Sequence, residues 1–177
     1  ELLLRAGGCE DLLDAPPPAA LEAVELCGRL PLALGIAGGI ITELEDEWQS
    51  ELIPLLKEEF SQDALVEESI VMASMRVVPQ DLRAGVEALF ALFAVFPEDA
   101  IVPAAAIDVL APLMHTVREA ANKRQVRKCL KQLLKANIMR GSIESGIWVH
   151  DLVRDFTITQ QNRRPGGLPV IPRLFPA

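Results

Sequence analysis

Apolar residues recur every three or four positions along most of the chain as far as Ala136, a period that predicts α-helices. In the first part of the chain we expect four helices, over residues 1–6, 19–27, 31 to about 45, and 48–60. The second of these carries Leu21, Val24 and Cys27 as its apolar residues at helical spacing. Pro31 suits the first turn of the third helix, where its missing N–H would have no partner.

The third predicted helix contains Gly38 and Gly39 in its interior. Each glycine costs about 1 kcal/mol relative to alanine at such a position. We therefore expect a neighbouring backbone to approach this helix closely. Its buried residues are expected to be Leu34, Ala37, Ile40, Ile41 and Leu44.

In the second part of the chain, helices are expected over residues 66–75, 80–95, 103–110 and 119–136. The period then changes, because residues 138–140 and 147–149 are short β-prone runs, joined by residues 141–146 in a pattern typical of a hairpin. A last helix is expected over residues 150–157. Helices, a hairpin and a closing helix follow one another as in a winged-helix fold. The predicted fold class is mainly α: a small helical bundle (1–61), a winged-helix domain with one short β-hairpin (62–160), and a disordered tail rich in proline and glycine (161–177).

The net charge of −8 gives the chain no general reason to bind nucleic acid or anionic lipid. Its three cysteines lack a C-x-x-C spacing, which indicates neither a disulfide framework nor a zinc site. The most apolar run, residues 30–41, is too short to span a bilayer, which takes about 20 residues. We expect a soluble, cytoplasmic protein without membrane contact.

Two features with possible chemistry favour ordinary structural roles. The acidic cluster of Glu43, Glu45, Asp46 and Glu47 could hold a metal ion, but a solvated helix end is the simpler interpretation. His115 has no surroundings that indicate chemistry, and no Ser/His/Asp or Cys/His arrangement is present to support nucleophilic catalysis. We therefore predict no metal site and no catalytic residue.

Three motifs follow one another along the chain. Residues 27–34 read Cys-Gly-Arg-Leu-Pro-Leu-Ala-Leu, residues 92–99 read Leu-Phe-Ala-Val-Phe-Pro-Glu-Asp, and residues 149–152 read Val-His-Asp-Leu directly after the predicted hairpin. In this order and at these separations they resemble the G-L-P-L-A, F-P-E-D and M-H-D segments of the NB-ARC family of STAND signalling ATPases. The resemblance covers roughly residues 1–160.

This resemblance implies a nucleotide-dependent switch in signal transduction. In the NB-ARC family a P-loop domain holds ADP at rest, and the helical and winged-helix parts close over it. Pro31 would pack near the adenine and ribose, with Leu30 and Arg29 beside it, and His150 would reach the β-phosphate. Asp151 could hold the local backbone by capping the helix that begins there. Exchange for ATP would displace the winged helix and expose oligomerisation surfaces.

The sequence departs from the family in three places. Val149 replaces the usual methionine, and Arg29 replaces a glycine, where its guanidinium could pair with a phosphate or point to solvent. The third departure is the lack of a G-x-x-x-x-G-K-[ST] segment to cradle phosphates. We therefore expect no ATPase activity from this chain alone, and ADP or ATP binding only together with a P-loop domain in cis or in trans.

Two other functions remain open. The helix before the hairpin is basic, with Lys123, Arg124, Arg127, Lys128, Lys131 and Lys135 on its polar face. Such a stripe could neutralise several DNA phosphates, form a solvated helix face, or dock on an acidic surface of the neighbouring subdomain. The rest of the chain is acidic and would repel DNA, so nucleic acid is not the expected partner. The remaining alternative is a protein-interaction module.

Overall fold

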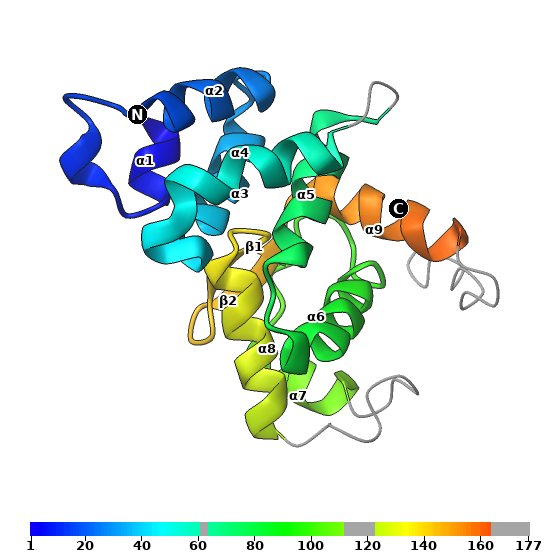
Figure 1. The fold of residues 1–177 in the computed structure, drawn as a ribbon. Helices are drawn as coiled ribbons and strands as arrows, with labels where there is room; N and C mark the ends of the chain where they lie inside the picture. Colours follow the sequence, from blue (N-terminus) through cyan, green and yellow to red (C-terminus); the bar gives the residue numbers. More distant parts are fainter. Residues whose placement is uncertain (61–63, 112–122, 164–177) are drawn as a thin grey trace.

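A computed structural model describes residues 1–60, 64–111 and 123–163. The described chain is mainly helical with one two-stranded antiparallel hairpin, which confirms the prediction of a mainly α fold with one short β-hairpin. Its first part holds α1 (Leu2–Ala6), α2 (Pro18–Leu26), α3 (Pro31–Leu44) and α4 (Trp48–Glu59), with short 3-10 turns at Glu10–Leu12 and Glu45–Glu47. These elements, blue to cyan in Figure 1, gather at one end of the molecule.

The second part of the chain follows the order expected of a winged helix. It consists of α5 (Val66–Arg76), α6 (Gln80–Phe93), α7 (Ala104–Leu110), α8 (Lys123–Lys135), β1 (Met139–Ser142), β2 (Gly146–Val149) and α9 (Asp151–Arg163). The predicted start of the basic helix at residue 119, the predicted boundary near residue 62 and most of the predicted tail, residues 164–177, lie outside the described residues. No helix in the described ranges is both long enough and apolar enough to cross a membrane.

Proline and glycine mark several helix boundaries, and Pro31 does so as predicted. Pro31 is the first residue of α3, and Pro79 stands immediately before α6. At the other kind of boundary, Gly7 follows the last residue of α1, and its N–H donates to a carbonyl of the preceding turn. These are the positions at which a missing N–H or a missing Cβ costs least.

A single buried core runs through both parts of the chain. Helix α5 lies between them, packed on α3 and α4 on one side and on α9 on the other (Figure 1). Its residues Ile70, Val71 and Ala73 are fully buried. The helical bundle and α9 are therefore joined through α5 by continuous apolar contact.

Helix α2 differs from the prediction, because Leu21 is 56% exposed. The helix instead buries Ala20 and Ala23, while Cys27, which directly follows it, is buried as the spacing indicated; α2 packs on α4. Small side chains at spacings of three and four allow two helix backbones to come close, and that packing turns the larger leucine outward.

Helix α9 continues to Arg163, past its predicted end at residue 157 and into the segment predicted as disordered tail. The helix packs on α5 and α6, and Val153 and Phe156 supply its buried contact. Tertiary packing of this kind stabilises a helix beyond what its local sequence predicts.

The hairpin pairs Met139 with Val149 and Ser142 with Gly146. Gly141 and Gly146, placed by the sequence in the connecting loop, lie inside this pairing with φ values of 94° and 102°, which only glycine adopts readily. Val102 extends the pairing on the other edge of β2, through N–O distances of 2.8 and 2.9 Å to Ile147. The isolated bridge at Val102, just before α7, therefore anchors the hairpin to the helices.

Three glycines of α3, which we call the glycine face (Gly35, Gly38 and Gly39), meet neighbours on two sides. A Cβ on Gly38 would lie 2.4 Å from the Cβ of Ala6 in α1. A Cβ on Gly39 would lie 2.5 Å from the carbonyl carbon and oxygen of Ala136, just after α8. The close backbone approach predicted at Gly38 and Gly39 is thus confirmed.

We expect Gly39→Ala to lower the free energy of unfolding by about 2 kcal/mol, because overpacking against a backbone outweighs the helix-propensity gain of about 1 kcal/mol. Gly35→Ala is the matched control in the same helix, since its Cβ would meet only the movable tip of Arg140 at 2.7 Å. The control should change stability by less than about 1 kcal/mol. Urea unfolding measures both, and equal effects would contradict the backbone contact.

Candidate functional site

The turn between α2 and α3 carries the first motif. Gly28 and Arg29 both adopt left-handed conformations, with φ values of 60° and 58°. Leu30 returns to an extended conformation and Pro31 begins α3. Leu30 is half-buried and packs against the core, whereas Pro31 is exposed. The two consecutive left-handed residues let the chain reverse so that Pro31 lies at the surface.

The position at which the resemblance expects glycine is therefore a position that favours glycine. Arg29 occupies it at a steric cost, because its Cβ lies close to the following carbonyl oxygen in this conformation. Its guanidinium is exposed and lies 2.7 Å from the carboxylate of Glu25, one turn earlier. The hydrogen bond to Glu25, aided by its charge, raises the pKa of Arg29. Of the two orientations left open by the sequence, the observed one engages Glu25 at the surface.

The turn between β2 and α9 carries the third motif. His150 is exposed, and its Nδ1 accepts a hydrogen bond from the backbone N–H of Leu152 at 3.3 Å. Its carbonyl accepts the first bond of α9, from the N–H of Arg154 at 2.9 Å. His150 is therefore the N-cap of α9, and the prediction that Asp151 caps this helix is wrong, since Asp151 is its first helical residue.

The capping hydrogen bond determines which ring nitrogen of His150 carries the proton. Because Nδ1 accepts a hydrogen bond, we infer that the neutral ring carries its proton on Nε2. The Nε2–H donor stands at the exposed start of a helix, where the helix dipole also favours an anion. This arrangement can donate to a phosphate oxygen without giving up the cap.

Arg154 ties the middle motif to the third, which the sequence did not reveal. Its Nε donates to the carbonyl of Phe96 at 2.9 Å, and its Nη1 lies 3.7 Å from the carboxylate of Glu98. Because Arg154 lies one turn into α9, residues 96–98 are held against the helix that His150 caps. The signal that could have found it is weak: Arg154 is the one basic residue between β2 and residue 162.

Asn137 and Arg140 connect α3 to the hairpin. The amide of Asn137 donates to the carbonyl of Gly35 at 3.1 Å, and Arg140 donates to the Asn137 side chain at 3.3 Å. Asn137 follows α8 with a φ of 55°, the left-handed conformation in which asparagine often ends a helix. Gly35 is one turn after Pro31, and Arg140 pairs across the hairpin with Trp148. The first and third motif turns are thus joined by one short path through the glycine face.

Pro31 and His150 are exposed, and they line neither of two cavities in the described part of the chain. A polar cavity of about 390 Å³ lies beside Trp48, and a smaller one of about 120 Å³ lies beside Phe90. Neither is lined by residues of the first or third motif. At Pro31 and His150 the described part of the chain presents exposed side chains.

The acidic cluster does not behave as one group. The side chain of Glu43 is only 8% exposed and pairs with Lys135 of α8 at 2.9 Å, so its assignment to a solvated helix end is wrong. Glu45, Asp46 and Glu47 are exposed, as expected. Among the described residues no group of histidine, cysteine and carboxylate side chains is arranged to hold a metal ion.

The basic stripe of α8 is partly neutralised within the chain. Asp108 of α7 accepts Arg127 at 2.6 Å and lies 3.5 Å from Lys123, and Glu43 engages Lys135. Three exposed basic residues have no acidic partner in the described part of the chain: Arg124, Lys128 and Lys131. Half of the stripe, Lys123, Arg127 and Lys135, therefore docks α8 on α7 and α3.

The cysteines have the environment of small apolar residues. Cys27 is buried, and desolvation raises its pKa to about 12. Desolvation also raises the pKa values of Cys9 and Cys129. All three are free thiols, and at neutral pH they are protonated and poorly nucleophilic.

No protein-family model matches this chain, and no curated protein matches it either.

We expect Arg29→Gly to be more thermostable than Arg29→Ala by about 2–4 °C, a shift typical of a modest gain in a chain of this size. Both variants lose the contact with Glu25, but only glycine relieves the left-handed strain at φ 58°. Thermal unfolding followed by circular dichroism compares them. Equal midpoints would mean that this backbone conformation is not strained.

We expect weak, sequence-independent binding of duplex DNA. Three unpaired basic residues release few counterions, so log Kd should rise with log salt with a slope of about 3. Fluorescence anisotropy over a salt series measures this slope. A slope of about 5 would require all six basic residues to contact phosphates and would favour the nucleic-acid alternative.

Proposed function

We propose that this chain is the regulatory portion of a nucleotide-dependent signalling switch similar to the NB-ARC proteins. In this role the surface around Pro31 and His150 covers an ADP molecule held by a P-loop domain, in the same polypeptide or in another. One observation carries the proposal: the two motif turns are exposed at the starts of α3 and α9, while the glycine face joins them behind the surface.

Pro31 and His150 have different tasks in this proposal. The exposed ring of Pro31 offers a rigid apolar surface against adenine and ribose, and the half-buried Leu30 supports it from the core side. His150 donates from Nε2 to the β-phosphate. Asp151 follows His150 in the sequence, and the negative charge of its exposed carboxylate would disfavour the additional charge of a γ-phosphate relative to ADP.

Arg29 has a structural part in the proposed switch. Its pairing with Glu25 holds the guanidinium at the end of α2 in the observed conformation. The turn that it belongs to places Pro31 at the surface, which is what the proposed contact with the nucleotide requires. We therefore assign the direct nucleotide contacts to Pro31 and His150.

Binding and hydrolysis are assigned to the partner domain in this proposal. The sequence contains no P-loop to cradle phosphates, and a nucleotide resting on Pro31 and His150 alone would be open to water on its other side. The chain itself would then respond to the nucleotide without cleaving it. Such a two-state response depends on a difference in affinity between ADP and ATP.

The deciding experiment is association of this chain with a separately produced P-loop domain of an NB-ARC protein, measured by calorimetry with ADP, with ATP and without nucleotide. We expect ADP to tighten association, and His150→Asn to weaken the ADP-dependent part about 10-fold, the value of one charge-assisted hydrogen bond. Asparagine is a good N-cap, so α9 keeps its cap while the imidazole donor is lost.

The matched control is His115→Asn, which removes the other histidine of the chain. It should leave ADP-dependent association unchanged. Two results would refute the sensing role of His150. The affinity of the two domains could be the same with and without ADP, or His150→Asn and His115→Asn could weaken the ADP-dependent association equally. Circular dichroism of each variant confirms that helix content is preserved.

A further inference from the structure

One side of α8 carries the three exposed cations that have no acidic partner in the described part of the chain. We call these residues, Arg124, Lys128 and Lys131, the basic face. Spacings of four and three residues place them along one side of the helix, and Lys135 continues the same line four residues later. Lys135 pairs with Glu43 of α3 at 2.9 Å. The basic face therefore leads along α8 to the C-terminal end of α3.

An acidic surface begins at the same end of α3. We call it the acidic end, and it consists of four exposed carboxylates: Glu45, Asp46, Glu47 and Glu51. Within the described ranges none of the four takes part in an ion pair. The pair of Lys135 with Glu43 thus stands between a basic and an acidic surface, and within one copy it joins only their adjoining edges.

A polar cavity of about 390 Å³ opens at the acidic end. Its charged lining residues are Asp11, Glu45 and Asp46, all of them acidic, and Leu12 and Trp48 add apolar lining. Lysine and arginine suit such a cavity, because their methylene stems pack on apolar surface while the charged head stays near the carboxylates. The acidic end therefore offers a recess for a cationic side chain.

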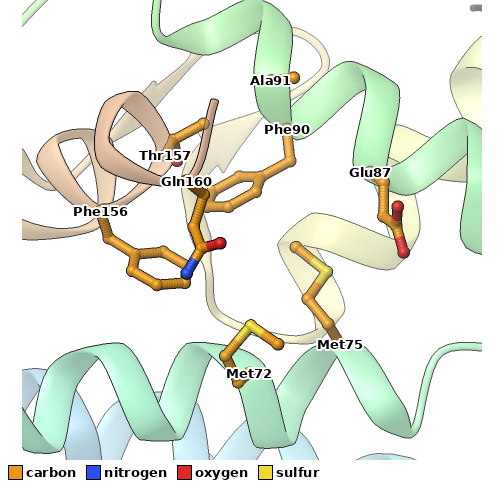
Figure 2. A pocket seen from close by; sticks show the side chains of 8 residues that line it. All are labelled: Met72, Met75, Glu87, Phe90, Ala91, Phe156, Thr157 and Gln160. Atoms are coloured by element: carbon orange, nitrogen blue, oxygen red, sulfur yellow. The ribbon is translucent and has the colours of Figure 1, made fainter. Parts of the chain in front are cut away.

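A smaller cavity, where α5, α6 and α9 meet, differs in its lining. Figure 2 shows the rings of Phe90 and Phe156 and two methionine side chains around it. The one carboxylate among its lining residues is that of Glu87. An incoming ammonium or guanidinium group would lose its hydration against this mainly apolar wall with little compensation. Of the two cavities, the one beside Trp48 therefore matches the basic face in charge.

We propose that two copies of this chain form a symmetric dimer in which the basic face of each copy lies against the acidic end of the other. A lysine or arginine of each basic face enters the partner's cavity beside Trp48. The proposal is independent of the nucleotide switch, because none of these residues belongs to the three motifs except by neighbouring them in the fold. The dimer therefore forms without nucleotide.

The order of the two surfaces along α8 fits a two-fold axis. Arg124 lies about 16 Å before Lys135 along the helix, at 1.5 Å per residue, and the acidic end lies beyond Lys135. A two-fold axis that crosses α8 at right angles near Lys135 makes the two α8 helices antiparallel. Each basic face is then opposite the partner's acidic end, and the assembly closes as a dimer because both surfaces are used in both copies.

Charge favours a second copy over DNA as the occupant. A duplex that followed the basic face along α8 would next meet the acidic end, which repels phosphates. The net charge of −8 also opposes association of two copies at long range. At physiological salt that repulsion is screened beyond about 8 Å, whereas the paired surfaces are in direct contact. Local complementarity therefore determines whether the dimer forms.

The test is sedimentation equilibrium of the full chain without nucleotide, over a range of protein concentrations. We expect a dimer at physiological salt that dissociates at about 1 M salt, where the screening length falls to about 3 Å. Lys128→Glu and Asp46→Lys should each weaken dimerisation about 10-fold or more, because the symmetric dimer contains each repulsive contact twice. An equimolar mixture of the two variants should dimerise again, since the heterodimer pairs opposite charges at both contacts.

The matched control is Arg29→Glu, which changes the net charge by the same amount at the opposite end of α3. It should leave dimerisation unchanged, and circular dichroism confirms that each variant keeps its helix content. Any of four results would overturn the proposal: a chain that stays monomeric at every concentration, assemblies that grow beyond a dimer, an effect of Arg29→Glu equal to that of Lys128→Glu, or a mixture that dimerises no better than either variant alone.

Discussion

The contact of the glycine face of α3 with its neighbours sets the geometry of the whole molecule. Gly38 lies against Ala6 and Gly39 lies against Ala136, in both cases without room for a Cβ. At both positions the backbones themselves are in close contact. A change of side-chain rotamer therefore cannot alter the distance between them. One helix therefore fixes α1 on one side and the end of α8 on the other, and the remaining contacts between the two parts of the chain form around that fixed distance.

Polar contacts then complete the junction at both ends of the glycine face. Glu43 pairs with Lys135 at one end, and Asn137 binds the carbonyl of Gly35 at the other. The buried position of Glu43 makes this pair costly to separate, because a lone buried carboxylate loses its compensation. The same α3 carries Pro31 one turn before Gly35. The position of the first motif is thus coupled to the hairpin that leads into His150.

The sequence predicted the helices well because helix boundaries and helical spacing depend on residues that are only a few positions apart. Proline and glycine mark the boundaries, and the period of the apolar residues marks the helix between them. Pro31 begins its helix as expected. The apolar period that predicted a helix before the hairpin corresponds in α8 to the buried side chains of Val126, Cys129, Leu130 and Leu133. The predictions were wrong where a contact with a residue far along the chain determines burial or helix length. Leu21 is exposed because alanines bring α2 against α4, and α9 is longer than predicted because α5 and α6 support it. Glu43 is buried because α8, far along the chain, supplies its lysine.

The candidate site shows the same division between local and distant information. The motifs placed Pro31 and His150 at helix starts, which is a local property, and both side chains are exposed there. Periodicity could not reveal that Arg154 holds Phe96, or that Asn137 reaches Gly35, because each bond joins residues far apart in sequence. An exposed proline and one imidazole donor bury little of a nucleotide, whereas specific sites enclose most of their ligand. If these residues bind a nucleotide, the opposite wall must therefore come from a second domain, and affinity then depends on the closure of one domain over the other.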